Sequence, residues 1–360
     1  MTLPTLHQNI ILLKLIPRLG NRGIVKLISE SHNLETENIS DSYILSLLKS
    51  YQTSPEAIRR RFERIARSIE SNALNLVCVS ESDYPEALKR SFAPPPLLFY
   101  KGNIKYDYSK SIAVVGTRSF SSYGKDACGS FVSELSVNGF TVISGLASGI
   151  DAIAHRTAIE KHATCIGVIG HGFNYCFPAS NKSLYQSVLD NNGAIISEFL
   201  PDIRPTKSTF PIRNKTIASL ARATIVIEAA EKSGSLITAK SAFAENREVY
   251  AVPADITRHS YQGCNLLIRS NIAKLVSRPS DLLADLGVGS SDSIRLPVES
   301  FNFSDLQKSF VDLVSLERIT SDEISDKLEI HITVISEILT ELELLGVITQ
   351  DDQQRWRIAN

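Results

Sequence analysis

The chain has 360 residues, of which 43% are hydrophobic and 21% are charged, as in an ordinary globular protein. No stretch approaches the roughly 18 uncharged apolar residues that a membrane span needs. The first residues also lack a basic region and a small-residue cleavage site, so we expect neither a span nor a signal peptide. The length suits two or three folded units rather than one.

The five cysteines are scattered and never spaced C-x-x-C. This spacing argues against a zinc ribbon and favours a reducing compartment, so we expect buried core cysteines and a cytoplasmic location. The seven histidines are likewise dispersed, and the sequence predicts no metal site and no cofactor.

Charge is distributed unevenly along the chain. Residues 1–72 carry 10 Lys/Arg against 7 Asp/Glu, and residues 73–285 carry 22 against 18. Residues 301–360 carry 5 against 12. A nucleic-acid site is therefore expected within the first 285 residues.

Residues 1–72 show helical periodicity, with a Gly-bearing turn at 17–23 between two short helices. We interpret them as a helical unit resembling SAM or helix-hairpin-helix domains, which either presents backbone N–H groups to a phosphate or serves as a plain connector. The arginine-rich helix at 59–67 is interpreted mainly as a solvated face. The proline-rich stretch 93–100 predicts an extended lead-in to the next domain.

From residue 111 to residue 285, apolar runs alternate with amphipathic helical segments. The predicted strands are continuous rather than alternating in polarity, as expected when both faces of a parallel sheet are buried. They lie at 112–115, 140–143, 165–169, 194–196, 224–227 and 248–252, and the helices at 124–138, 149–162, 181–191, 212–222 and 235–246. We therefore predict an α/β fold for 73–285, a doubly wound Rossmann-like parallel sheet.

A Gly/Ser-rich stretch at 286–300 predicts a linker. Residues 301–360 then show helix, turn, helix and a small hairpin, which predicts a winged helix. Its second helix, at 332–345, carries Glu337, Glu341 and Glu343 and no Lys or Arg. Three carboxylates would face the phosphates of a DNA groove, so we expect this domain to bind protein rather than DNA.

Three predicted strands end in turns rich in glycine and hydroxyl side chains, followed by helices. Such turns can seat phosphates at the carboxyl edge of the sheet. A further stretch between Asp202 and Glu228 holds five cations and no acid, with Phe210 beside them. Phosphates attract Lys and Arg, and unstacked bases attract aromatic faces. The candidate binding residues are Gly116, Thr117, Arg118, Ser119, Ser144, Gly145, Phe210, Arg213, Asn214, Lys215, Ser233, Gly234 and Ser235.

Catalytic patterns are weak in this sequence. Asp151 and His155 are four residues apart, which more often gives a local hydrogen bond than acid–base chemistry. There is no Walker A motif, no G-x-S-x-G elbow and no dinucleotide fingerprint after the first strand. We predict no catalytic residue and no enzymatic activity.

Several ordered motifs together resemble the DprA/Smf family of DNA-processing proteins. They are SGLASGIDAIAH at 144–155, FPIRN at 210–214 and EAAEKSGSLITA at 228–239. The resemblance implies a protein that binds single-stranded DNA without sequence preference, protects it and loads the recombinase RecA during natural transformation. It also implies a homodimer formed through the Rossmann-like domain. Ser148 stands where the family usually has arginine, so the cleft has one cation fewer.

Two other functions remain open from the sequence. One is a nucleotide-processing hydrolase on a related Rossmann-like fold, although the P-G-G-x-G-T-x-x-E loop of that family is missing. The other is a structural adaptor that works mainly through its acidic C-terminal domain. Substitution of Arg118 separates the adaptor from the DNA-binding protein, because an adaptor would not depend on that cation.

Overall fold

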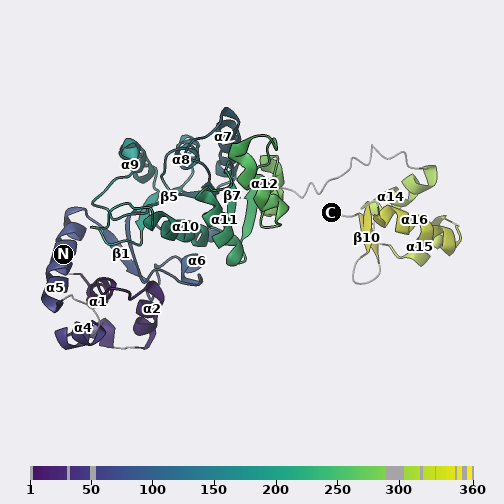
Figure 1. Ribbon diagram of the computed structural model, residues 1–360. Helices are drawn as coiled ribbons and strands as arrows, with labels where there is room; N and C mark the ends of the chain where they lie inside the picture. Colours follow the sequence, from purple (N-terminus) through teal and green to yellow (C-terminus); the bar gives the residue numbers. More distant parts are fainter. Residues whose placement is uncertain are drawn as a thin grey trace. The chain divides into compact units, whose positions relative to one another are not determined.

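The computed structural model describes residues 3–30, 33–48, 54–288, 304–316, 319–328, 330–344, 347–350 and 355–358. The chain divides into two compact units, Met1–Leu282 and Leu283–Asn360 (Figure 1). Most of the predicted linker, from residue 289 onward, lies outside the described residues. No helix in the described part of the chain is long and apolar enough to cross a membrane.

A nine-stranded sheet forms the centre of the first unit. Its strand order is β1-β2-β6-β5-β4-β3-β7-β8-β9, and all pairs from β6 to β9 are parallel. The parallel strands are β3 (Ser111–Val115), β4 (Thr141–Ser144), β5 (Cys165–Val168), β6 (Ala194–Ser197), β7 (Ala223–Val226), β8 (Glu248–Ala251) and β9 (Lys274–Leu275). Every residue of β3 to β7 is buried, which explains the continuous apolar runs in the sequence.

Helices connect the parallel strands as predicted for a doubly wound sheet, and the predicted α/β fold is confirmed. Those between β3 and β8 are α7 (Ser122–Val137), α8 (Ile150–Glu160), α9 (Lys182–Asp190), α10 (Thr209–Leu220) and α11 (Ser235–Ala244). Beyond β8 follow α12 (Gln262–Arg269) and α13 (Pro279–Asp285).

Two strands at one edge of the sheet were not predicted. They are β1 (Asn75–Cys78) and β2 (Leu97–Gly102), and they pair antiparallel with each other while β2 pairs antiparallel with β6. The extended segment predicted at 93–100 thus contains the start of β2, which begins at Leu97, directly after the prolines. The short helix α6 (Glu86–Lys89) lies between them in the chain.

The N-terminal helices share a core with this antiparallel edge. They are α1 (Thr5–Lys14), α2 (Asn21–Glu30), α3 (Asn33–Thr36), α4 (Asp41–Leu47) and α5 (Pro55–Ser71). Ile10 and Ile11 of α1 belong to the same buried cluster as Leu97 and Phe99 of β2. The two predicted helices are present, although α2 begins at Asn21, inside the turn predicted at 17–23. The boundary predicted at residue 72 nevertheless falls inside one compact unit, because apolar burial continues across it.

The second unit has its own core, which includes Phe310, Leu339 and Trp356. Its elements are α14 (Asp305–Leu316), α15 (Ser321–Leu328), α16 (Ile332–Leu344), β10 (Ile348–Gln350) and β11 (Trp356–Ile358). The two strands pair antiparallel. The helices α15 and α16 and the hairpin after them follow the predicted order, whereas α14 was not predicted. The assignment as a winged helix stays a prediction.

Candidate nucleic-acid interface

The order of strands reverses between β3 and β7. From β3 the chain proceeds outward through β4, β5 and β6, and it then returns to place β7 on the other side of β3. In open parallel sheets such a switch point leaves a crevice beyond the carboxyl ends of the strands, where ligands bind. The loops that follow β3 and β7 both lie at this position.

A cavity of about 320 Å³ lies at the switch point. Its lining contains the end of β3, residues of the loops that follow β3 and β7, and residues from one side of α10. Eight predicted site residues meet there: Gly116, Arg118, Phe210, Arg213, Asn214, Ser233, Gly234 and Ser235. The structure therefore brings together residues up to about 120 positions apart in the sequence, as the strand-end argument required.

Arg118 is the exposed cation of this cavity. Its guanidinium carbon lies 5.1 Å from the centre of the Phe210 ring, which is a cation–π distance. Gly170 faces Phe210 too, because a Cβ at Gly170 would come within 2.8 Å of the ring. The aromatic ring therefore holds the arginine at the cavity while its charge remains accessible to solvent.

The loop that carries Arg118 is anchored by Glu228, which the sequence analysis did not identify as a site residue. The backbone N–H of Thr117 donates to the carbonyl of Glu228 at 2.7 Å. Glu228 also accepts from Ser121, at 2.9 Å from the backbone nitrogen and 3.1 Å from Oγ, through its carboxylate Oε2. Glu228 is fully buried. The feature of the sequence that could have identified Glu228 is its position, as an acidic residue directly after the predicted strand 224–227.

Thr117 and Ser119 use hydrogen-bonding groups to stabilise the turn that they form. Ser119 donates its backbone N–H to Thr117 Oγ1 at 3.2 Å, and the carbonyl of Thr117 accepts from Ile150 at 3.1 Å. The first N–H of α8 is therefore already paired within the protein. Gly149 has a φ of +86°, and a Cβ there would lie 2.3 Å from the Thr117 carbonyl oxygen, so only glycine permits this contact.

The structure differs from the prediction at the turn after β4. Ser144 is buried, and its hydroxyl donates to the Val114 carbonyl at 2.7 Å, so its side chain stabilises the sheet rather than facing a ligand. Gly145 is also buried, and its carbonyl accepts a hydrogen bond from Arg213. A side chain at Gly145 would overlap both Arg213 and Asp151. Ala147 of this turn lines the cavity, whereas Ser144 and Gly145 do not.

Arg213 is buried as well, with 4% of its surface exposed. Its Nη1 donates to the carbonyls of Gly145 and Val168, the latter at 2.8 Å, and its Nε donates to Asn214 Oδ1 at 3.0 Å. The prediction treated this guanidinium as a cation that faces phosphate. Its hydrogen bonds instead tie α10 to the ends of β4 and β5.

Asp151, in the first turn of α8, supplies the charge that accompanies Arg213. Burial raises the pKa of the Asp151 carboxyl, and the nearby Arg213 guanidinium opposes that rise. The expected Asp151–His155 hydrogen bond is not found among the described residues. Burial lowers the pKa of His155 to about 4, so its ring is neutral at physiological pH.

Lys215 lies on the opposite side of α10 from the cavity. Residues two apart on a helix point about 200° apart, so Arg213 and Lys215 cannot serve the same surface. Lys215 lines a separate cavity of about 710 Å³ together with Lys14 and Glu198. Two cations of the stretch between Asp202 and Glu228, Arg213 and Lys215, therefore lie on different faces of α10.

The loop after β7 completes the cavity. Ser233 and Ser235 share a hydroxyl–hydroxyl hydrogen bond of 2.8 Å, and the Gly234 carbonyl accepts from Asn214 Nδ2 at 3.0 Å. Gly234 is exposed and Ser235 begins α11. This loop lies at a helix N-terminus, a position that favours anions.

We expect Arg213→Met to destabilise the protein strongly. The substitution leaves two buried carbonyls without a donor and the Asp151 carboxyl without its cation, so the free energy of unfolding should fall by about 3–5 kcal/mol. Urea denaturation at neutral pH measures it, with Arg118→Met as an exposed control expected within about 0.5 kcal/mol of the parent chain. Equal stabilities of the two variants would contradict the structural role of Arg213.

Comparison with known proteins places this arrangement in one family. A family model described as DNA recombination-mediator protein A matches residues 75–287. Protein Smf of Escherichia coli is 34% identical over 267 residues, which cover 74% of this chain and 71% of that protein. DNA processing protein DprA of Streptococcus pneumoniae is 41% identical over 202 residues, covering 56% and 71%.

Solved structures agree with this placement. The X-ray structure of DNA processing protein A from Streptococcus pneumoniae superposes with a TM-score of 0.66 at 34% identity, covering 79% of this chain and 99% of that one. DNA processing protein A from Helicobacter pylori superposes with a TM-score of 0.54 at 27% identity, covering 59% and 95%. Since the family match includes the whole sheet and the cavity described above, this chain belongs to the DprA/Smf family of DNA recombination-mediator proteins.

Proposed function

We propose that the chain binds single-stranded DNA without sequence preference and acts as a recombination mediator. The observation that carries the proposal is the switch-point cavity, where the exposed Arg118 and two strand-end loops surround Phe210. The family match supports the mediator role, and the work on the Helicobacter pylori relative concerns its single-stranded DNA binding mode.

The chemistry of the cavity suits a phosphate backbone. Arg118 offers a charged, multidentate donor, and the loop after β7 lies at the N-terminus of α11. Such contacts supply affinity but read no base sequence. They explain why binding should be sequence-independent and sensitive to salt.

Aromatic side chains next to the cavity suit unstacked bases. Phe177 is 41% exposed, and its ring centre lies 5.7 Å from that of Phe210. Bases of single-stranded DNA can stack on such faces, whereas those of a duplex are already stacked. We propose that Phe177 receives a base while Phe210 orients Arg118.

We propose that the chain works by binding rather than by catalysis. The ionisable groups that line the cavity are Arg118, Arg213 and Asp151. Arg213 and Asp151 are both buried, and Arg213 donates to two backbone carbonyls, which supports a structural role for this pair. The expected functions in DNA protection, RecA loading and natural transformation belong to the same proposal. The free cysteines support action in the reducing cytoplasm.

Arg118→Ala should weaken binding of labelled poly-dT by about tenfold and reduce its salt dependence, because a phosphate contact is lost. Fluorescence anisotropy at two salt concentrations, with duplex DNA as competitor, measures both quantities. Lys215→Ala is the matched control, since Lys215 is exposed on the other face of α10 and should leave affinity nearly unchanged. A larger loss of DNA affinity for Lys215→Ala than for Arg118→Ala would show that the DNA binds at another surface.

We propose that the homodimer forms along the β9 edge of the sheet. β9 ends the strand order, and Leu275 on it is 53% exposed beside a cavity that is also lined by Phe243, itself 50% exposed. Exposed apolar side chains at the edge of a sheet favour self-association.

The double variant Phe243→Glu/Leu275→Glu should lower the mass of the chain in solution from that of a dimer to that of a monomer, because carboxylates replace the apolar contact. Light scattering across a concentration series measures the mass. A variant carrying Ile256→Glu, which removes another exposed apolar side chain, should remain dimeric. A monomeric parent chain would refute the proposed dimer itself.

The second unit is proposed to bind protein. Glu337, Glu341 and Glu343 are all exposed on α16. Because the unit has its own core, the fragment 301–360 should fold by itself. It should show no micromolar binding to duplex DNA at physiological salt, as measured by anisotropy. Micromolar binding would contradict the proposal.

A further inference from the structure

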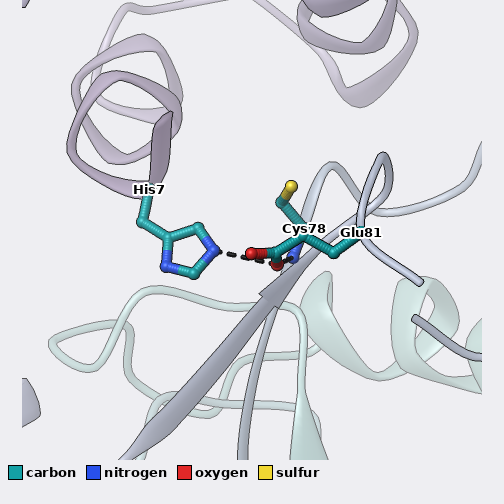
Figure 2. A group of neighbouring side chains, drawn as sticks. All are labelled: His7, Cys78 and Glu81. Atoms are coloured by element: carbon teal, nitrogen blue, oxygen red, sulfur yellow. Dashed lines mark hydrogen bonds and ion pairs between the residues drawn. The ribbon is translucent and has the colours of Figure 1, made fainter. Parts of the chain in front are cut away.

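Three potential metal ligands from distant parts of the chain converge at the junction of α1 and β1 (Figure 2). His7 lies on α1, Cys78 is the last residue of β1, and Glu81 lies in the turn that follows. One ligand atom from each side chain lies within 4.8 Å of the others, and His7 Nε2 is 3.0 Å from Glu81 Oε2. None of the three lines the switch-point cavity.

The donor set is an imidazole nitrogen, a thiol sulfur and a carboxylate oxygen. This combination is typical of Zn²⁺, whose bonds of roughly 2.0–2.3 Å place neighbouring donors about 3.3–3.8 Å apart in a tetrahedron. Mg²⁺ and Ca²⁺ prefer oxygen donors alone. The His7–Glu81 separation of 3.0 Å lies just below these values and the other two separations are at most 4.8 Å, so the three donors are near enough to share one ion.

Two of the three ligands are held by packed elements. His7 is 5% exposed, and Cys78 is fully buried within the core shared by α1 and the antiparallel strands. The Glu81 side chain is 40% exposed, which leaves an entry path and a fourth position for water. Rigid placement of two ligands lowers the cost of ordering the site.

Neighbouring groups already orient the ligand atoms. Glu81 Oε2 accepts the backbone N–H of Cys78 at 2.6 Å, which fixes the carboxylate beside the histidine. Ser80 Oγ lies 3.1 Å from Cys78 Sγ and can donate to a thiolate. Hydrogen-bond partners of this kind orient the side chains that bind the ion at metal centres.

We propose that His7, Cys78 and Glu81 bind one Zn²⁺ ion, which fastens α1 to the edge strand β1. The ion would join the N-terminal helices to the sheet at a place where the His7–Glu81 contact and apolar packing already link them. The site is independent of DNA binding at the switch point.

Metal-free full-length chain, titrated with Zn²⁺ against a chromophoric chelator, should bind one ion per chain at this site. Co²⁺ in place of Zn²⁺ should give a thiolate-to-metal charge-transfer band, and excess Mg²⁺ should not compete. Cys78→Ser should remove the band and weaken Zn²⁺ binding by more than about a hundredfold, beyond the effect of losing an outer partner. His7→Gln should weaken binding as well.

Cys176→Ser is the matched control, because Cys176 is the partly exposed cysteine and could bind metal adventitiously. This variant should keep the charge-transfer band and the affinity. A parent chain without the band, or a band lost with Cys176→Ser and kept with Cys78→Ser, would overturn the proposal. Far-ultraviolet circular dichroism of each metal-free variant confirms that it is folded, and poly-dT binding separates this site from the proposed DNA function.

Discussion

The buried guanidinium of Arg213 is the interaction on which the candidate site depends. It donates to the carbonyls that end β4 and β5 while its helix, α10, presents Phe210 to the cavity. Buried carbonyls need donors, and a buried cation needs a counter-charge, which Asp151 supplies from α8. These four elements are thus fixed relative to one another before any ligand is bound.

In this arrangement some charged residues stabilise the protein, and a different one is available to bind a ligand. Arg213, Asp151 and Glu228 are buried and position the loops, whereas Arg118 is exposed on one of those loops. Phe210 connects the two groups, since both arginines lie within 6 Å of its ring centre. A cavity built in this way is preorganised, which lowers the ordering cost of binding a flexible strand.

Much of the fold could be predicted because its signals are local. Continuous apolar runs identified the six strands from β3 to β8, and the amphipathic segments between them identified the helices. The antiparallel strands β1 and β2 escaped prediction, since β1 has four residues and β2 follows three prolines. Short edge strands depend on their neighbours more than on their own pattern.

The sequence by itself determined the parallel sheet, the position of the strand-end loops and the family, because burial on both faces and glycine turns leave marks within a few residues. Only the tertiary structure decided which polar residues face the cavity. Arg213 and Lys215 look equivalent in the sequence, yet helical geometry places one in the core and the other on the far face. The convergence of His7 with Cys78 and Glu81 was equally invisible, because their proximity arises from packing between α1 and β1 across about 70 residues.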